Sequence, residues 1–179
     1  MNNFIYHNPT KLVFGKGQIA RLGKLIPADK KIMITFGGGS VRRNGVYDQV
    51  LKALEGRDWV EFWGIEPNPS VETVREAVAL GRENGSDFLL AVGGGSVIDT
   101  AKAISLGAKN SVPLWELYSG KAQTQRALPI GVVLTTAATA SEANGVSVLC
   151  HDVLHEKAAL DEPLTRPRFA LMNPVLTYT

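Results

Sequence analysis

Apolar and polar positions follow two different periods along this chain. Continuous apolar runs such as residues 88–92 predict strands that are buried on both faces of a sheet. Between such runs apolar residues recur at helical spacing, as Val71, Val74 and Val78 do after the candidate N-cap Ser70. The expected strands are 11–14, 31–36, 59–63, 88–92, 128–133 and 168–172, and the expected helices are 18–26, 47–54, 70–85, 96–106 and a single turn at 113–118.

Strands that alternate with helices in this way predict an α/β fold. The expected architecture is a doubly wound, mainly parallel sheet with helices on both faces. Residues 146–149 and 157–160 are the expected arms of a short β-hairpin beside that sheet.

Composition and charge narrow the class of protein. A chain of 179 residues with 45% hydrophobic and 20% charged residues is typical of one soluble domain, here 1–179. The net charge of +2 and the lack of a dense Lys/Arg stretch argue against a nucleic-acid partner. A single cysteine excludes an intramolecular disulfide and favours a cytoplasmic location. We expect no secretory signal in residues 1–7, and no apolar run approaches the roughly 20 residues that span a membrane.

The strongest candidate for chemistry is the run Gly93-Gly94-Gly95-Ser96, which directly follows an expected buried strand. A glycine turn that opens a helix leaves backbone N–H groups free at the positive end of the helix dipole, which suits a phosphate. Ser96 and Asp99 also have the spacing of a capping box, so these two residues could merely begin the helix. Capping does not explain three consecutive glycines, and we therefore favour a phosphate site.

Two further stretches follow strand ends. Gly37-Gly38-Gly39-Ser40 comes directly after the expected strand at 31–36. The run 135–144 is rich in small residues and hydroxyls, which can wrap around a polar ligand or form an ordinary surface loop. These residues alone leave both interpretations open.

Taken together, these motifs resemble one family. G-G-G-S-x-x-D-x-A-K at 93–102 and T-T-A-x-T-x-S-E at 135–142 are similar to motifs of the iron-containing (group III) alcohol dehydrogenases. The opening at 8–17 and the closing at 173–179 fit as well. The turn at 37–40 and the break at 65–69 resemble the branch of NADPH-dependent aldehyde reductases and butanol dehydrogenases.

The resemblance implies a Rossmann-like N-terminal domain that binds NAD(P). The turn at 93–96 would hold the diphosphate, Asp99 would lie near the nicotinamide, and Leu176 would flank the cofactor. The remaining residues implied to contact the cofactor are Thr135, Thr139, Asn144 and Lys157. The chain departs from many relatives at Ala138 and Ala140, where glycine is usual and where alanine would resist a positive φ.

Residues after the second strand bear on the choice of cofactor. An acidic residue there commonly binds the 2′-OH of NAD and repels a 2′-phosphate. Here the position is Gly37, and Ser40, Arg42 and Arg43 follow it. We therefore expect NADP(H) rather than NAD, although Arg42 and Arg43 would also suit a solvated helix start.

The resemblance also implies metal ligands that have no counterpart in this sequence. In the family these ligands, one aspartate and three histidines, lie on a second, helical domain that would follow Thr179. We therefore expect no catalytic or metal-binding residue in this chain and no activity of the chain alone. The intact enzyme would bind a divalent metal, Fe or else Zn, form a homodimer and act on a small alcohol/aldehyde pair.

The histidines and the cysteine have simpler interpretations. His151 and His155 have helical metal-ligand spacing, but in a hairpin residues i and i+4 do not converge. We expect both to be solvated turn residues, and Cys150 to be a buried strand residue.

Two other functions remain open. One is a glycerol-dehydrogenase-like zinc polyol dehydrogenase that uses NAD and shares the fold. The other is a stand-alone nucleotide-binding module with a regulatory role. Separate titrations with NADPH and NADH would distinguish them.

Overall fold

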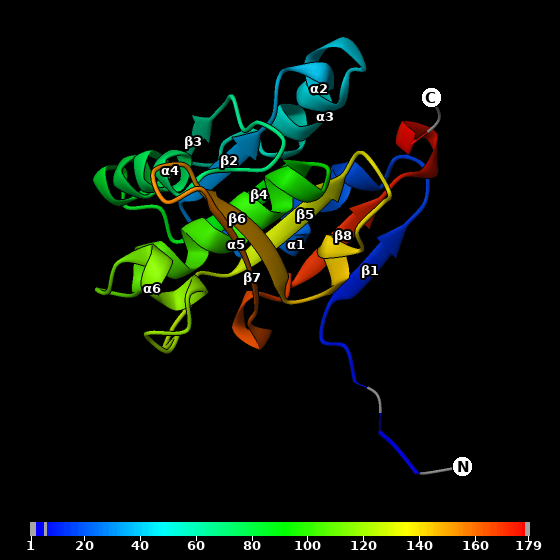
Figure 1. Ribbon diagram of the computed structural model, residues 1–179. Coiled ribbons are helices and arrows are strands. Elements are labelled where there is room, and N and C mark those ends of the chain that lie inside the picture. Colours follow the sequence, from blue (N-terminus) through cyan, green and yellow to red (C-terminus); the bar gives the residue numbers. More distant parts are fainter. Residues whose placement is uncertain (1–2, 6, 178–179) are drawn as a thin grey trace.

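Six parallel strands form the central sheet of the computed structural model, which describes residues 3–5 and 7–177 (Figure 1). Their order across the sheet is β1-β8-β5-β4-β2-β3. The strands are β1 (Lys11–Phe14), β2 (Ile32–Phe36), β3 (Trp59–Phe62), β4 (Phe88–Gly93), β5 (Ile130–Leu134) and β8 (Phe169–Met172). Every residue of β2, β4 and β5 is buried, as their continuous apolar runs predict.

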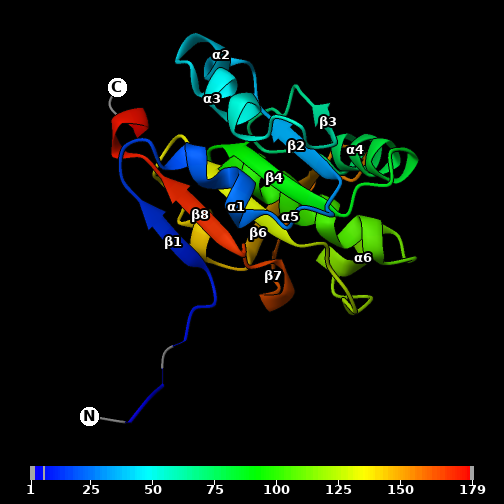
Figure 2. The same cartoon turned by 180° about the vertical axis from the view of Figure 1, so that it is seen from behind.

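Helices cover both faces of the sheet, as Figures 1 and 2 show from opposite sides. One core cluster packs the sheet against η1 (Gln18–Arg21), α1 (Leu22–Leu25), α2 (Ser40–Arg43) and α3 (Val46–Ala53). The other packs it against α4 (Val71–Glu83), α5 (Gly95–Lys109) and α6 (Leu114–Tyr118). The antiparallel hairpin of β6 (Val146–His151) and β7 (Glu156–Asp161) lies on the α5 side. The doubly wound, Rossmann-like fold with its hairpin is therefore confirmed.

A local signal accounts for the start of α4. Ser70 is the N-cap of α4, because its hydroxyl accepts a hydrogen bond from the backbone N–H of Thr73. The expected helix at 18–26 is instead a 3-10 turn followed by a short α-helix. Short 3-10 turns also occur as η2 (Ser141–Ala143), η3 (Pro163–Thr165) and η4 (Pro174–Thr177). Cys150 does lie in a strand, but it is only half-buried, so the expectation of a buried cysteine was wrong.

The connections between strands change direction at one point in the sheet. The chain leaves β2 toward β3 at one edge, returns to β4 on the other side of β2, and then continues to β5. The carboxyl ends of the neighbouring strands β2 and β4 therefore flank a topological switch point. In open parallel sheets this is where ligands bind.

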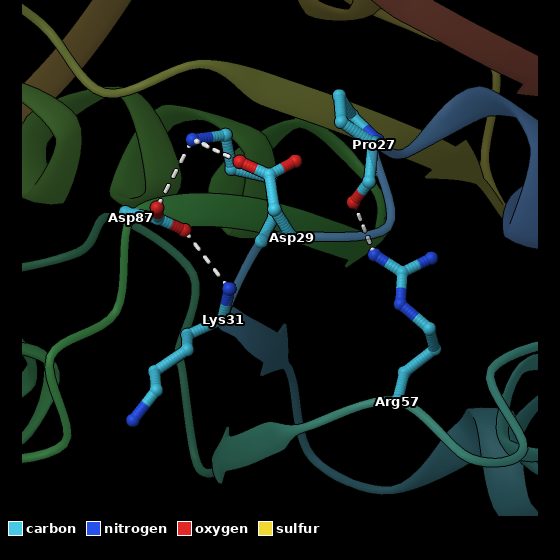
Figure 3. Close-up of polar contacts among 6 residues, drawn as sticks. Pro27, Asp29, Lys31, Arg57 and Asp87 are labelled. Carbon is cyan, nitrogen blue, oxygen red and sulfur yellow. Dashed lines mark hydrogen bonds and ion pairs between the residues drawn. The ribbon is translucent and has the colours of Figure 1, made fainter.

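The opposite, amino end of these strands is held by structural polar contacts (Figure 3). The Asp87 carboxylate accepts a hydrogen bond from the backbone N–H of Lys31 at 2.9 Å and forms an ion pair with the Lys30 ammonium at 3.1 Å. The Arg57 guanidinium donates to the carbonyl of Pro27. These contacts join the loops before β2, β3 and β4.

Candidate functional site

The two glycine turns of the sequence meet at the switch point. Phe36 at the end of β2 pairs with Val92 near the end of β4, so the turns that follow these strands are neighbours. A Cβ built on Gly37 would lie 3.5 Å from the Val97 side chain in α5. Gly39 has a φ of 94°, a left-handed conformation that favours glycine. The sheet thus places 37–40 beside 93–97.

The loop at 135–140 packs directly onto the second glycine turn. A Cβ on Gly95 would lie 2.8 Å from the Thr139 hydroxyl oxygen, and one on Gly94 would lie 3.3 Å from Thr136 Cβ. The close approach of this loop therefore disfavours a side chain at both positions, most strongly at Gly95, whether or not a ligand also binds. α5 begins at Gly95 with no acidic residue in its first turn, which leaves the positive end of its dipole uncompensated.

Asp99 does not take part in a capping box. The N-cap of α5 is Gly94, and no side chain caps it, so the capping interpretation of Ser96 and Asp99 was wrong. The Asp99 carboxylate instead accepts hydrogen bonds from the Ser141 hydroxyl at 2.6 Å and from the backbone N–H of Val148 at 3.1 Å. Burial raises the pKa of Asp99, and these two bonds and the Lys102 charge partly oppose the rise.

Lys102 lies one turn after Asp99 on the same helix and is completely buried. Its ammonium donates to the Ser141 hydroxyl at 2.8 Å, to Asn144 Oδ1 at 3.0 Å and to the Val146 carbonyl at 2.7 Å. Burial lowers the pKa of Lys102 to about 8, although the nearby carboxylates, Asp99 foremost, counteract this effect. Lys102 and Ser141 were not among the sequence-predicted site residues. The three-residue spacing of Asp99 and Lys102 was the signal that could have indicated the pair.

The loop at 135–144 contains one residue with a strained backbone conformation. Ala140 has a φ of 54° and is therefore left-handed, which is the strain that its departure from glycine predicts. Ala138 is not among the residues of positive φ. Asn144 accepts hydrogen bonds at Oδ1 from Lys102 and from the backbone N–H of Val146, and its amide nitrogen faces the Thr139 carbonyl at 3.4 Å.

The two remaining predicted residues lie in different places. The exposed ammonium of Lys157, in β7, donates to Asn68 Oδ1 at 2.7 Å, in the Pro67–Pro69 break. Leu176 is half-buried in η4 and packs against the core cluster on the α3 face. The last two residues of the closing motif, Tyr178 and Thr179, lie outside the described residues.

An aromatic cluster beside the first glycine turn holds Arg42. The guanidinium carbon lies 4.1 Å from the centroid of the Trp63 ring and 5.1 Å from that of Tyr47. Glu61 accepts hydrogen bonds from Trp63 Nε1 at 2.7 Å and from the Tyr47 hydroxyl at 3.0 Å. No ion pair involves Arg42 among the described residues. Trp63 directly follows β3 and is distant from Arg42 in sequence, so sequence spacing does not reveal this contact.

The histidines differ from expectation in one respect. His155 is exposed in the hairpin turn, but His151 is a half-buried residue of β6 whose ring packs edge-on against Trp115 at 5.1 Å. Its Nδ1 lies 3.9 Å from Glu72. The interpretation of both as solvated turn residues was therefore wrong for His151.

Neither a metal site nor a membrane span is evident in the part of the chain that the structure describes. Across residues 3–5 and 7–177, no group of three or more His, Cys, Asp or Glu side chains is arranged to hold a metal ion. Within the same residues, no helix has both the length and the apolar character to cross a bilayer.

Comparison with known proteins decides the family. The family model for iron-containing alcohol dehydrogenases matches residues 9–174. The chain belongs to the iron-containing alcohol dehydrogenase family. This match confirms the resemblance carried by the glycine turn, the 135–142 motif and the opening motif.

Two curated relatives are nearly half identical to this chain. It is 49% identical to the NADPH-dependent aldehyde reductase YqhD of Escherichia coli and 48% identical to the probable NADH-dependent butanol dehydrogenase 1 of Bacillus subtilis. Each match covers 100% of this chain and 47% of the relative. The chain therefore spans about half the length of these curated relatives.

Solved structures of the family share the fold. The crystal structure of E. coli YqhD matches with a TM-score of 0.94 at 48% identity, over 99% of this chain and 46% of that one. The NADH-dependent butanol dehydrogenase A of Thermotoga maritima matches with a TM-score of 0.95 at 41% identity, over 100% of this chain and 46% of that one. The fold described above is thus that of the N-terminal half of an iron-containing alcohol dehydrogenase.

Proposed function

We propose that this chain binds NADP(H) at the carboxyl ends of β2, β4 and β5, as the cofactor-binding part of an oxidoreductase for an alcohol/aldehyde pair. The observation that carries the proposal is the meeting of two glycine turns and the α5 N-terminus at a topological switch point. That arrangement offers backbone N–H groups and a positive dipole end to a diphosphate.

Each predicted residue has a role in this proposal. Backbone N–H groups at 93–96 hold the diphosphate, and Asp99 lies toward the nicotinamide, which supplies the hydride when the cofactor is bound. The other proposed contacts are Gly37, Gly38, Gly39, Ser40, Thr135, Thr139, Asn144, Lys157 and Leu176. Gly38 and Gly39 support this role, because a Cβ on either would meet no atom within 4 Å, which leaves open space beside the turn.

The preference for NADP rests on charge at the first glycine turn. Position 37 is a glycine and carries no carboxylate that would repel a 2′-phosphate. The carboxylate of Glu61 accepts hydrogen bonds from Trp63 and Tyr47. Arg42 is held on the same aromatic rings and brings a cation to this end of the sheet. The relatives do not decide the matter, since one is named NADPH-dependent and the other NADH-dependent.

Titration of the purified chain with NADPH and NADH, by calorimetry or by cofactor fluorescence, tests the proposal. We expect NADPH to bind more tightly. Arg42→Ala should weaken NADPH binding about tenfold and leave NADH binding unchanged, since a lost charge-assisted contact costs about 1.5 kcal/mol. Arg43→Ala is the matched control, because Arg43 is also exposed in α2 but has no aromatic platform among the described residues.

The outcomes separate the alternatives. Tighter binding of NADH would favour the NAD-dependent polyol dehydrogenase, and binding of neither nucleotide would refute the cofactor role. Equal effects of the two arginine variants would refute the assignment of Arg42.

The activity of the intact enzyme is a further part of the proposal. We propose that a divalent metal, Fe or else Zn, the homodimer and the alcohol/aldehyde substrate belong to a protein about twice as long as this chain. The chain by itself should then not reduce an aldehyde. Metal-dependent consumption of NADPH with butanal by the purified chain would contradict this expectation.

A further inference from the structure

A fully buried lysine inside a cofactor-binding fold requires an explanation. Burying an ammonium ion costs several kcal/mol before any compensation, and a methionine would fill a similar volume without that cost. Lys102 is nevertheless completely buried in α5. Its three N–H groups each find a different acceptor, so its burial depends on the segment that supplies those acceptors.

All three acceptors lie in one short stretch of chain. They are the Ser141 hydroxyl in η2, the Asn144 side chain in the loop and the Val146 carbonyl at the start of β6. Lys102 therefore connects residues 141–146 to α5 through three hydrogen bonds. This stretch directly follows the loop that packs on Gly94 and Gly95.

The contacts of Lys102 help to orient two proposed cofactor residues. An ammonium can only donate, so Lys102 and the backbone N–H of Val146 together hold Asn144 Oδ1 inward, and this turns the amide nitrogen toward the exposed side near Thr139. Ser141 accepts from Lys102 and donates its own proton to Asp99. The second oxygen of Asp99 accepts from the Val148 N–H, so the carboxylate is held at both oxygens.

We infer that Lys102 is a positioning residue for the cofactor site: as an ammonium it orients Asn144 directly and Asp99 through Ser141. This inference rests on the proposed function, because those two residues matter only if the nucleotide binds there. Lys102 has no exposed surface and would not touch the nucleotide itself.

The role requires the charged form of the side chain. A neutral amine has two N–H groups and a lone pair, and the lone pair would face one of three acceptors. Burial lowers the pKa of Lys102 to about 8, so this change falls within an accessible pH range. The charged groups that face it are Asp99 on α5, Glu142 in η2, Asp161 in β7 and Arg166 after η3.

The test measures NADPH binding by the 179-residue chain and by Lys102→Met, which keeps the volume and removes the charge. At pH 7 we expect the dissociation constant of the variant to be raised at least about tenfold, as for the loss of a charge-assisted hydrogen bond. The matched control is Lys109→Met, which makes the same change at an exposed position of the same helix. It should bind NADPH as the wild type does.

The pH dependence separates positioning from a general effect on folding. Binding by the wild type and by Lys109→Met should weaken as pH rises through about 8, whereas binding by Lys102→Met should be weak and nearly independent of pH. Ser141→Ala removes the link to Asp99 together with one of the three acceptors of Lys102, leaves the bond from Lys102 to Asn144 in place, and should lose part of the affinity. The wild-type titration needs no substitution, so it tests the inference even if a variant does not fold.

Each outcome has one meaning. If the wild type binds NADPH and Lys102→Met binds equally well with the same pH profile, the inference about Lys102 is wrong and the proposed function stands. If the wild type binds no nucleotide, the proposed function is wrong and the inference fails with it.

Discussion

Replacing Lys102 by methionine should change how the stability of the fold depends on pH. The side chain has no exposed surface, and burial lowers its pKa from 10.5 to about 8. Between these two values the unfolded chain binds more protons at this residue than the folded chain does. The free energy of unfolding of the wild type therefore rises with pH in this window, and the full cost of the buried charge is present below pH 8.

The magnitude follows from the two pKa values. The difference between 10.5 and about 8 corresponds to about 3 kcal/mol, at about 1.4 kcal/mol for each tenfold change in proton affinity. Between pH 7 and pH 10 the wild type should gain about 2.5 kcal/mol relative to Lys102→Met. Tyr47 and Tyr118 also contribute near the upper end of this range, because burial raises the pKa of each above its value in the unfolded chain. Their contributions cancel when the two proteins are compared at each pH.

Urea unfolding of both proteins at half-unit steps from pH 7 to pH 10 measures this difference. Only the slope of the difference against pH is predicted, because Lys102→Met also leaves the Val146 carbonyl without its Lys102 donor and so shifts the whole curve by a constant amount. Parallel curves for the two proteins would refute the reasoning. They would mean that the ammonium keeps an ordinary pKa in the fold.

Substitutions at three further positions test the backbone and the packing, each by the midpoint of urea unfolding. Ala140→Gly should stabilise the fold by about 0.5 to 1 kcal/mol, because the left-handed φ of 54° strains alanine more than the added chain entropy costs, and a loss of stability would contradict that geometry. Ser70→Ala should cost about 1 kcal/mol through the lost N-cap of α4, whereas Ser70→Asp should retain most of the stability. Gly131→Ala should destabilise by about 1 to 3 kcal/mol, because a Cβ would overlap the Phe169 ring on β8, and a neutral effect would show that this ring moves freely.

Some parts of the fold were predictable because their causes are local. The continuous apolar runs of β2, β4 and β5 predict buried strands, and Ser70 predicts the start of α4. The helix expected at 18–26 broke into a 3-10 turn and a short α-helix, which apolar spacing alone does not distinguish. The burial of Cys150 and His151 was misjudged, because exposure in a hairpin depends on the elements that pack against it.

The candidate site likewise has parts that local sequence predicts and parts that depend on packing. The sequence alone indicated the glycine turns at 37–40 and 93–96 and the small-residue loop after β5, since a glycine run after a buried strand carries its own physical reason. The motifs together also indicated the family, which the match over residues 9–174 confirms.

Only the tertiary structure decided how these pieces meet. The order of the strands places the two turns side by side at the switch point, and nothing in the chain order states that β4 returns beside β2. The three acceptors of Lys102 lie about forty residues away in sequence, and the Arg42 guanidinium lies over a ring that follows β3. Local patterns specify which backbone forms where, but hydrogen bonds and burial between distant segments depend on packing, which exists only once the sheet has assembled.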